Sequence, residues 1–80
     1  NTYCEDIQTK LEAKQILAII EKMPDDYKLI FNLRAVEEYS FDEIAQNINR
    51  NINTIRVYYQ RARTWLLDRI QSEEKKNEIN

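Results

Sequence analysis

The stretch that decides the fold is residues 40–63, which read SFDEIAQNINRNINTIRVYYQRAR. It opens on a capping box, in which the Ser40 hydroxyl can accept a hydrogen bond from the Glu43 amide and the Glu43 carboxylate one from the Ser40 amide. Apolar residues then recur at helical spacing: Phe41, Ile44, Ala45 and Ile48. This pattern predicts a short helix that begins after Ser40 and runs for about two turns.

Asparagine occupies every second position from Asn47 to Asn53, although it is a poor former of helices and strands. Asn49 follows the short helix, where a left-handed residue often ends a helix and where Asn is the best substitute for Gly. Asn51 precedes the next apolar run and can cap a helix by accepting from the amide of Asn53 or Thr54. The asparagines therefore predict a tight turn between two helices rather than a low-complexity segment.

The helix after this turn is the longest that the sequence predicts. Its apolar residues fall on one face at steps of three and four: Ile52, Ile55, Tyr59, Ala62, Leu66 and Ile70. Another face carries small, polar and cationic side chains and no carboxylate: Asn53, Arg56, Val57, Gln60 and Arg61. A short helix, a tight turn and a long helix form the layout of a helix-turn-helix.

Two further helices are predicted ahead of this motif. Residues 10–23 carry apolar residues near helical spacing: Leu11, Ile16, Leu17 and Ile20. A second helix starts with Pro24 in its first turn, followed by Asp25 and Asp26, which oppose the positive end of its dipole. Its apolar side is expected to hold Tyr27, Ile30, Phe31, Arg34 and Val36.

We therefore expect an all-α, four-helix domain over residues 10–72, with the helix-turn-helix at 40–70. Residues 1–9 are predicted to be a flexible lead-in. Residues 73–80 are predicted to be a charged tail, disordered beyond its first few residues. Because the chain begins at Asn1 rather than Met, we expect it to be a piece of a longer protein.

Charge is distributed unevenly along the chain. The net charge is −2, but residues 44–67 contain four arginines and no acidic residue. Local charge sets where a polyanion docks, and the total charge mainly tunes the rate and strength of association. The basic stretch coincides with the predicted helix-turn-helix, and this favours DNA as a partner.

Other functional classes are disfavoured by composition. A single cysteine, Cys4, and the absence of histidine exclude an internal disulfide and the usual zinc sites. No nucleophile–base pair or cofactor motif can be assembled, so neither an enzyme nor a cofactor is predicted. No membrane-spanning run or signal peptide is evident, and we expect a cytoplasmic protein.

The ordered set of motifs from Met23 to Leu66 resembles region 4 of bacterial sigma factors, most closely the extracytoplasmic-function group. Met23-Pro24 stands for the family's Leu-Pro, Phe31-Asn32-Leu33-Arg34 for its Phe-x-Leu-Arg, and residues 39–45 for its Leu-Ser-Tyr-x-Glu-Ile-Ala. Residues 53–63, NTIRVYYQRAR, are similar to its recognition helix. Three positions that are often Gly in the family hold Glu38, Asn49 and Asn53. Since Glu38 does not favour a left-handed conformation, we expect the turn before Ser40 to differ.

The resemblance implies that the last helix enters the major groove of the promoter −35 element. Base edges are then assigned to Arg56, Val57, Gln60 and Arg61. Arg can donate two hydrogen bonds to guanine, Gln can pair similarly with adenine, and Val can meet a thymine methyl. Phosphate contacts are assigned to Asn53, Thr54, Tyr58 and Arg63. Arg50 occupies a position where the family usually has an apolar residue, and we do not assign it to DNA.

The resemblance also implies partners besides double-stranded promoter DNA. Family members dock on RNA polymerase core through the tip of the beta-subunit flap, and Ile19, Leu33 and Val36 are candidates to line the apolar groove that receives it. Anti-sigma proteins, which compete for related surfaces, are a further class of partner.

Alternatives remain open from the residues alone. The arginines could form an ordinary solvated helix face, and Tyr59 and Trp65 are expected to serve packing rather than base stacking. The chain could be the effector domain of a LuxR-like regulator, or a module that binds only a regulatory protein.

Overall fold

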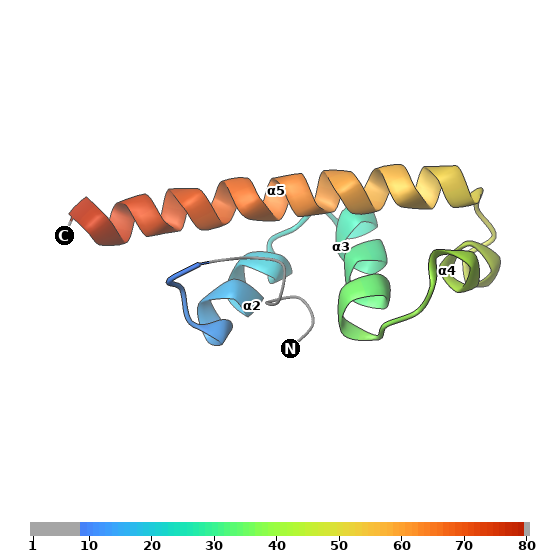
Figure 1. Ribbon diagram of the computed structural model, residues 1–80, viewed down its shortest axis with the longest axis horizontal. Helices are drawn as coiled ribbons and strands as arrows, with labels where there is room; N and C mark the ends of the chain where they lie inside the picture. The colour runs from blue at the N-terminus through green and yellow to red at the C-terminus, as the bar shows by residue number, and fades with distance from the viewer. Residues whose placement is uncertain (1–8, 80) are drawn as a thin grey trace.

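Four α-helices and one π-helix account for most of residues 9–79, which the computed structural model describes, with side chains described as far as Lys76. The elements are α2 (Ala13–Glu21), α3 (Asp25–Phe31), the π-helix η1 (Asn32–Val36), α4 (Phe41–Asn47) and α5 (Ile52–Ile79). The described chain contains no strand, so the predicted all-α fold is confirmed. Figure 1 shows α5 running the length of the molecule, with α2, α3 and α4 all on one side of it.

The predicted helix-turn-helix is present, and each of its local signals is observed. The Glu43 amide donates to Ser40 Oγ at 3.1 Å, and the Ser40 amide donates to Glu43 Oε1 at 3.0 Å, which completes the capping box of α4. Asn49 adopts the left-handed conformation with φ of 54°. The Asn53 amide donates to Asn51 Oδ1 at 2.8 Å, so Asn51 caps α5.

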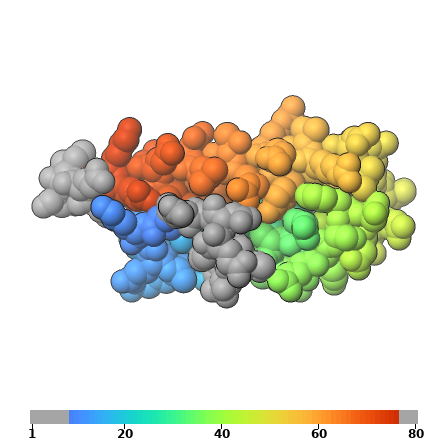
Figure 2. All heavy atoms as spheres, viewed as in Figure 1, coloured from blue at the N-terminus to red at the C-terminus, as the bar shows by residue number. Residues whose placement is uncertain are grey.

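The core consists of two clusters that share α5. The first cluster joins α2, α3, η1 and the middle of α5, and its buried members are Leu11, Ile16, Ile19, Ile20, Met23, Phe31, Ala35, Ala62, Leu66 and Ile70. The second cluster, Ile30, Ile44 and Ile55, holds α4 against the start of α5. Figure 2 shows the atoms of α2 (blue) packed under the later turns of α5 and those of α4 (green) under its first turns.

The first and last helices differ from their predicted extents. The first covers Ala13–Glu21 rather than residues 10–23, and it buries Ile19 while leaving Leu17 46% exposed. The last continues to Ile79, so the prediction that the tail is disordered beyond its first few residues is wrong as far as Ile79. Thr9 Oγ1 donates to the Glu74 carboxylate, and this bond attaches the last turns of α5 to the chain ahead of α2. The predicted flexible lead-in otherwise falls on residues 1–8, outside the described part of the chain.

The second predicted helix changes type part-way. Pro24 is the N-cap of α3 rather than a residue of its first turn, and the helix widens into η1 at Asn32. The wider turns place Ala35 in the core. Val36, which was predicted to lie on the apolar side of this helix, is 45% exposed.

The expectation that Glu38 would avoid the left-handed conformation is wrong, because Glu38 has φ of 64°. This conformation costs a residue with a Cβ about 1–2 kcal/mol. It lets the Tyr39 amide donate to the Leu33 carbonyl at 3.0 Å, which closes the end of η1. Arg34 Nη1 also donates to the Tyr39 carbonyl at 3.3 Å. These two hydrogen bonds offset the cost of the Glu38 backbone.

Buried and exposed leucines should respond very differently to truncation. Leu66 is fully buried where α5 meets the first cluster, whereas Leu17 is largely exposed on α2. We expect Leu66→Ala to lower the free energy of unfolding by about 2–5 kcal/mol, because it leaves a cavity. Leu17→Ala should change it by no more than about 0.5 kcal/mol. Urea denaturation of both variants tests the packing, and equal losses would contradict it.

The capping box should make stability depend on pH. The Ser40 backbone amide, and secondarily its hydroxyl, hold the pKa of the Glu43 carboxyl below its ordinary value of 4.5. A lowered pKa in the folded state contributes stability above pH 4.5, and this contribution disappears as the pH falls through the folded-state pKa. Glu43→Gln should therefore lose less thermal stability than wild type on acidification from about pH 6 to about pH 3. Melting curves of both proteins at the two pH values test this, and equal losses of thermal stability would show that the capping box does not lower this pKa.

Candidate nucleic-acid interface

The residues assigned to base edges lie on the exposed face of α5. Arg56, Val57, Gln60 and Arg61, which we call the reading face, are all exposed, and Val57 is 46% exposed despite being apolar. The opposite side of the same turns is buried, with Ile55 and Ala62 at 0% exposure. The stripe that anchors α5 therefore fixes which side chains face outward.

The Arg56 side chain is supported by the first helix of the motif. Its guanidinium carbon lies 5.8 Å from the centre of the Phe41 ring, and Phe41 belongs to α4. Arg34, from η1, lies over the same ring at 5.1 Å. The ring of Phe41 is in turn fixed edge-on against Tyr59, with centroids 5.5 Å apart. Since cation–π contacts hold a guanidinium without neutralising it, Arg56 keeps its charge in a defined place.

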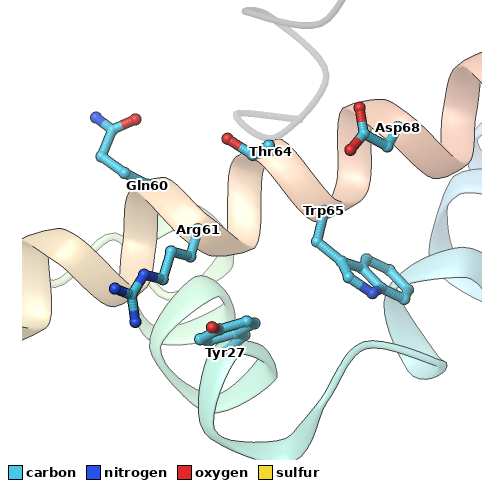
Figure 3. Close-up of a pocket in the computed structure, with 6 residues that line it drawn as sticks. All are labelled: Tyr27, Gln60, Arg61, Thr64, Trp65 and Asp68. Carbon is cyan, nitrogen blue, oxygen red and sulfur yellow. The ribbon is translucent and has the colours of Figure 1, made fainter.

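Arg61 lies along the edge of the reading face opposite to Arg56. Figure 3 shows Arg61 projecting from α5 towards the helix that carries Tyr27, and Trp65 projecting to the same side of α5, while Gln60, Thr64 and Asp68 project away. Together with Tyr27 these residues line an open hollow of about 390 Å³. The reading face thus presents cations along both of its sides, with Gln60 and Val57 between them.

The charges of this surface are not neutralised within the described part of the chain. Residues 44–67 contain no carboxylate. Among residues 9–76, neither Arg56 nor Arg61 forms an ion pair, whereas lysines elsewhere pair with nearby glutamates, for example Lys28 with Glu21. A surface of this kind attracts a polyanion even though the whole chain is negative.

The four residues assigned to phosphates differ in how far they are exposed to solvent. Asn53 and Thr54 are exposed in the first turn of α5. Tyr58 and Arg63 are half-buried. Tyr58 meets Tyr27 edge-on at 5.5 Å, and the Arg50 guanidinium lies 5.9 Å from the centre of its ring.

The other aromatic side chains of α5 serve packing, as predicted. Tyr59 stacks on Phe31 with centroids 5.9 Å apart, and Trp65 packs against the first cluster and carries Arg69 at 5.1 Å. Rings held in this way are not free to stack on unpaired bases.

The three residues assigned to polymerase docking do not gather on one surface. Ile19 is buried in the first cluster at 8% exposure, Leu33 is half-buried against the second cluster, and only Val36 is exposed. Sequence reasoning missed Leu29, which is 50% exposed on α3. Leu29, Leu33 and Val36 are spaced by four and three residues, and this spacing in the sequence could have identified an outward apolar stripe on α3 and η1.

Within the described residues there is no group of three or more His, Cys, Asp or Glu side chains able to hold a metal ion. None of the helices in this part of the chain is both long and apolar enough to cross a bilayer.

Residues 13–66 match the family model described as sigma-70, region 4. The chain belongs to the sigma-70 region 4 family. This is a family of DNA-binding domains that recognise promoters in transcription initiation, and it is not a family of enzymes. Comparison with curated proteins and with solved structures gave no significant match. The match concerns region 4 as a whole, so membership of the extracytoplasmic-function group stays a prediction.

Removing the ring that supports Arg56 should loosen its side chain. Phe41→Leu retains an apolar side chain next to the second cluster but removes the surface on which the guanidinium rests. We expect faster side-chain motion at the Arg56 Nε–H group, measured by ¹⁵N relaxation in the free protein, and no change at Arg69, which rests on Trp65. Unchanged Arg56 dynamics would show that the ring does not hold this residue.

Proposed function

We propose that this chain is the −35 recognition region of a sigma factor of the extracytoplasmic-function type, which directs RNA polymerase to promoters in the bacterial cytoplasm. One observation carries the proposal: in a region 4 helix-turn-helix, the exposed face of α5 presents Arg56 and Arg61 without a carboxylate partner among residues 9–76. Family membership supplies the class of target, and this face supplies the groups to bind it.

Each residue of the reading face matches one feature of a base edge in the major groove. Arg56 and Arg61 can each donate two hydrogen bonds to O6 and N7 of a guanine. Gln60 can pair with N6 and N7 of an adenine, and the exposed Val57 can meet a thymine methyl. A bidentate pair discriminates against the wrong base by about 1–3 kcal/mol. The order of these residues along α5 then sets the order of the bases that are read.

Phosphate contacts would fix the register of α5 in the groove. Asn53 and Thr54 are exposed at its start. Arg63 follows Arg56 by seven residues, or two helical turns, and so lies on the same side of α5. Since the net charge of the chain is −2, binding by this domain alone should be weak and strongly salt-dependent.

The outward stripe formed by Leu29, Leu33 and Val36 is the surface we propose for RNA polymerase. It lies on α3 and η1, whereas the reading face lies on α5, so the two surfaces use different residues of the same domain. Ile19 is left out of this surface because it is buried. An anti-sigma protein that covered either surface would block transcription initiation.

Substitution of the reading arginines tests the proposal. Duplexes enriched from a random pool by binding to the full chain serve as the specific probe, with the unselected pool as the non-specific probe. Arg56→Ala and Arg61→Ala should each weaken specific binding by about 1–3 kcal/mol, or roughly fivefold to 150-fold, measured by fluorescence anisotropy. Binding to the unselected pool should weaken less.

Arg69→Ala is the matched control, because Arg69 is also an exposed arginine of α5 but lies beyond the acid-free stretch. It should leave specific binding nearly unchanged. Circular dichroism checks that all three variants stay folded. Unchanged specific binding by both reading-face variants would reject DNA reading and favour a module that binds only a regulatory protein.

A further inference from the structure

Arg50 lies in the turn of the helix-turn-helix and has no role in the proposed base readout. Its backbone is fixed, since Asn49 turns the chain with φ of 54° and the Arg50 amide donates to the Ala45 carbonyl at 3.0 Å. Its side chain is exposed. The turn therefore holds a cation at the surface.

The Arg50 guanidinium is held by an aromatic pair. It lies 5.9 Å from the centre of the Tyr58 ring, which meets Tyr27 edge-on at 5.5 Å and 88°. The turn, α5 and α3 thus each contribute one side chain to this arrangement, which we call the Arg50 stack. A ring contact occupies the face of the guanidinium, so its in-plane N–H donors stay available for an anion.

Carboxylates near the Arg50 stack do not neutralise it. Asp25 and Asp26 line the hollow next to Tyr27 and Tyr58. Yet Arg50 forms no ion pair with any carboxylate of residues 9–76. Both aspartates belong to the first turn of α3, where the helix dipole favours them. The Arg50 guanidinium is therefore not engaged by these carboxylates.

The Arg50 stack lies along one side of the reading face. Tyr58 and Arg61 are three residues apart on α5 and so share a side, and Figure 3 shows Arg61 on the side that faces α3. Arg56, supported by α4, lies along the other side. A recognition helix in the major groove has a sugar–phosphate backbone along each side. Cations on both sides of α5 match these two strands.

We propose that Arg50 binds a backbone phosphate of the DNA strand that runs along the Arg61 side of α5. Tyr58, which the sequence assigned to phosphate, acts instead by holding Arg50, and Tyr27 holds Tyr58. The inference rests on the proposed function and adds to it a positioning contact that the sequence did not predict. Such a contact sets register and affinity and contributes no base discrimination.

The test is the salt dependence of DNA binding by the full chain, measured by fluorescence anisotropy from about 50 to 200 mM salt with a short duplex of mixed sequence. Arg50→Ala should make the slope of log K against log salt concentration shallower by about 0.9, the change expected for one lost phosphate contact. Arg69→Ala is the control: it also removes one positive charge and one contact between a guanidinium and an aromatic ring, here that of Trp65. It should leave the slope unchanged. Equal slopes for the two variants would overturn the proposal.

Two variants separate the role of Tyr58 from that of Arg50. Tyr58→Phe keeps the ring and loses the hydroxyl, so it should keep the wild-type slope; a slope as shallow as that of Arg50→Ala would instead make the hydroxyl the phosphate ligand. Tyr58→Leu removes the ring and should weaken DNA binding. In the double variant, in which Tyr58→Leu is combined with Arg50→Ala, DNA binding should be little weaker than with Arg50→Ala alone. Full additivity of these two changes would show that Tyr58 does not act through Arg50.

The outcomes for the two proposals are distinguishable. If Arg56→Ala loses preference for the selected duplex while Arg50→Ala keeps the wild-type slope, only the phosphate contact is rejected. If the wild-type chain shows no salt-dependent binding to either the selected or the mixed duplex, both proposals fall together.

Discussion

The buried stripe of α5 is the constraint on which the rest of the structure depends. The α-helices packed against it are short: α2 has nine residues and α3 and α4 have seven each. Helices of this length are not stable alone in water. Ile55, Ala62 and Leu66 are fully buried along one side of α5, and they link both core clusters to a single rigid helix. The same packing fixes the rotation of α5, and hence which residues it presents to a partner.

The helix-turn-helix could be predicted from the sequence because its signals act over a few residues. The bonds between Ser40 and Glu43, and between Asn51 and Asn53, span three and two positions. A left-handed Asn49 is likewise a local preference. The period of the apolar residues then sufficed to place Arg56 and Arg61 on the exposed face. That these residues read bases stays a prediction, because exposure alone does not show what they bind.

The features that were missed depend on contacts that override the local preferences of the residues concerned. Residues 73–79 have no apolar period, yet α5 continues through them, attached by the bond between Thr9 and Glu74 and supported by a surface ion pair between Lys76 and Glu73. The left-handed Glu38 contradicts its own preference and is held by hydrogen bonds to the Leu33 and Tyr39 carbonyls. Neither outcome follows from the intrinsic preferences of these residues.

Four arginines rest on aromatic rings and pair with no carboxylate of residues 9–76: Arg34 and Arg56 on Phe41, Arg50 on Tyr58, and Arg69 on Trp65. An ion pair would fix a guanidinium but cancel its charge, whereas a ring fixes it and leaves the charge intact. This difference matters in a protein whose net charge is −2, because repulsion by the rest of the chain must be overcome locally. Acid-free sequence and aromatic support together give the start of α5 a concentrated positive charge, which a polyanion can meet without first breaking an ion pair.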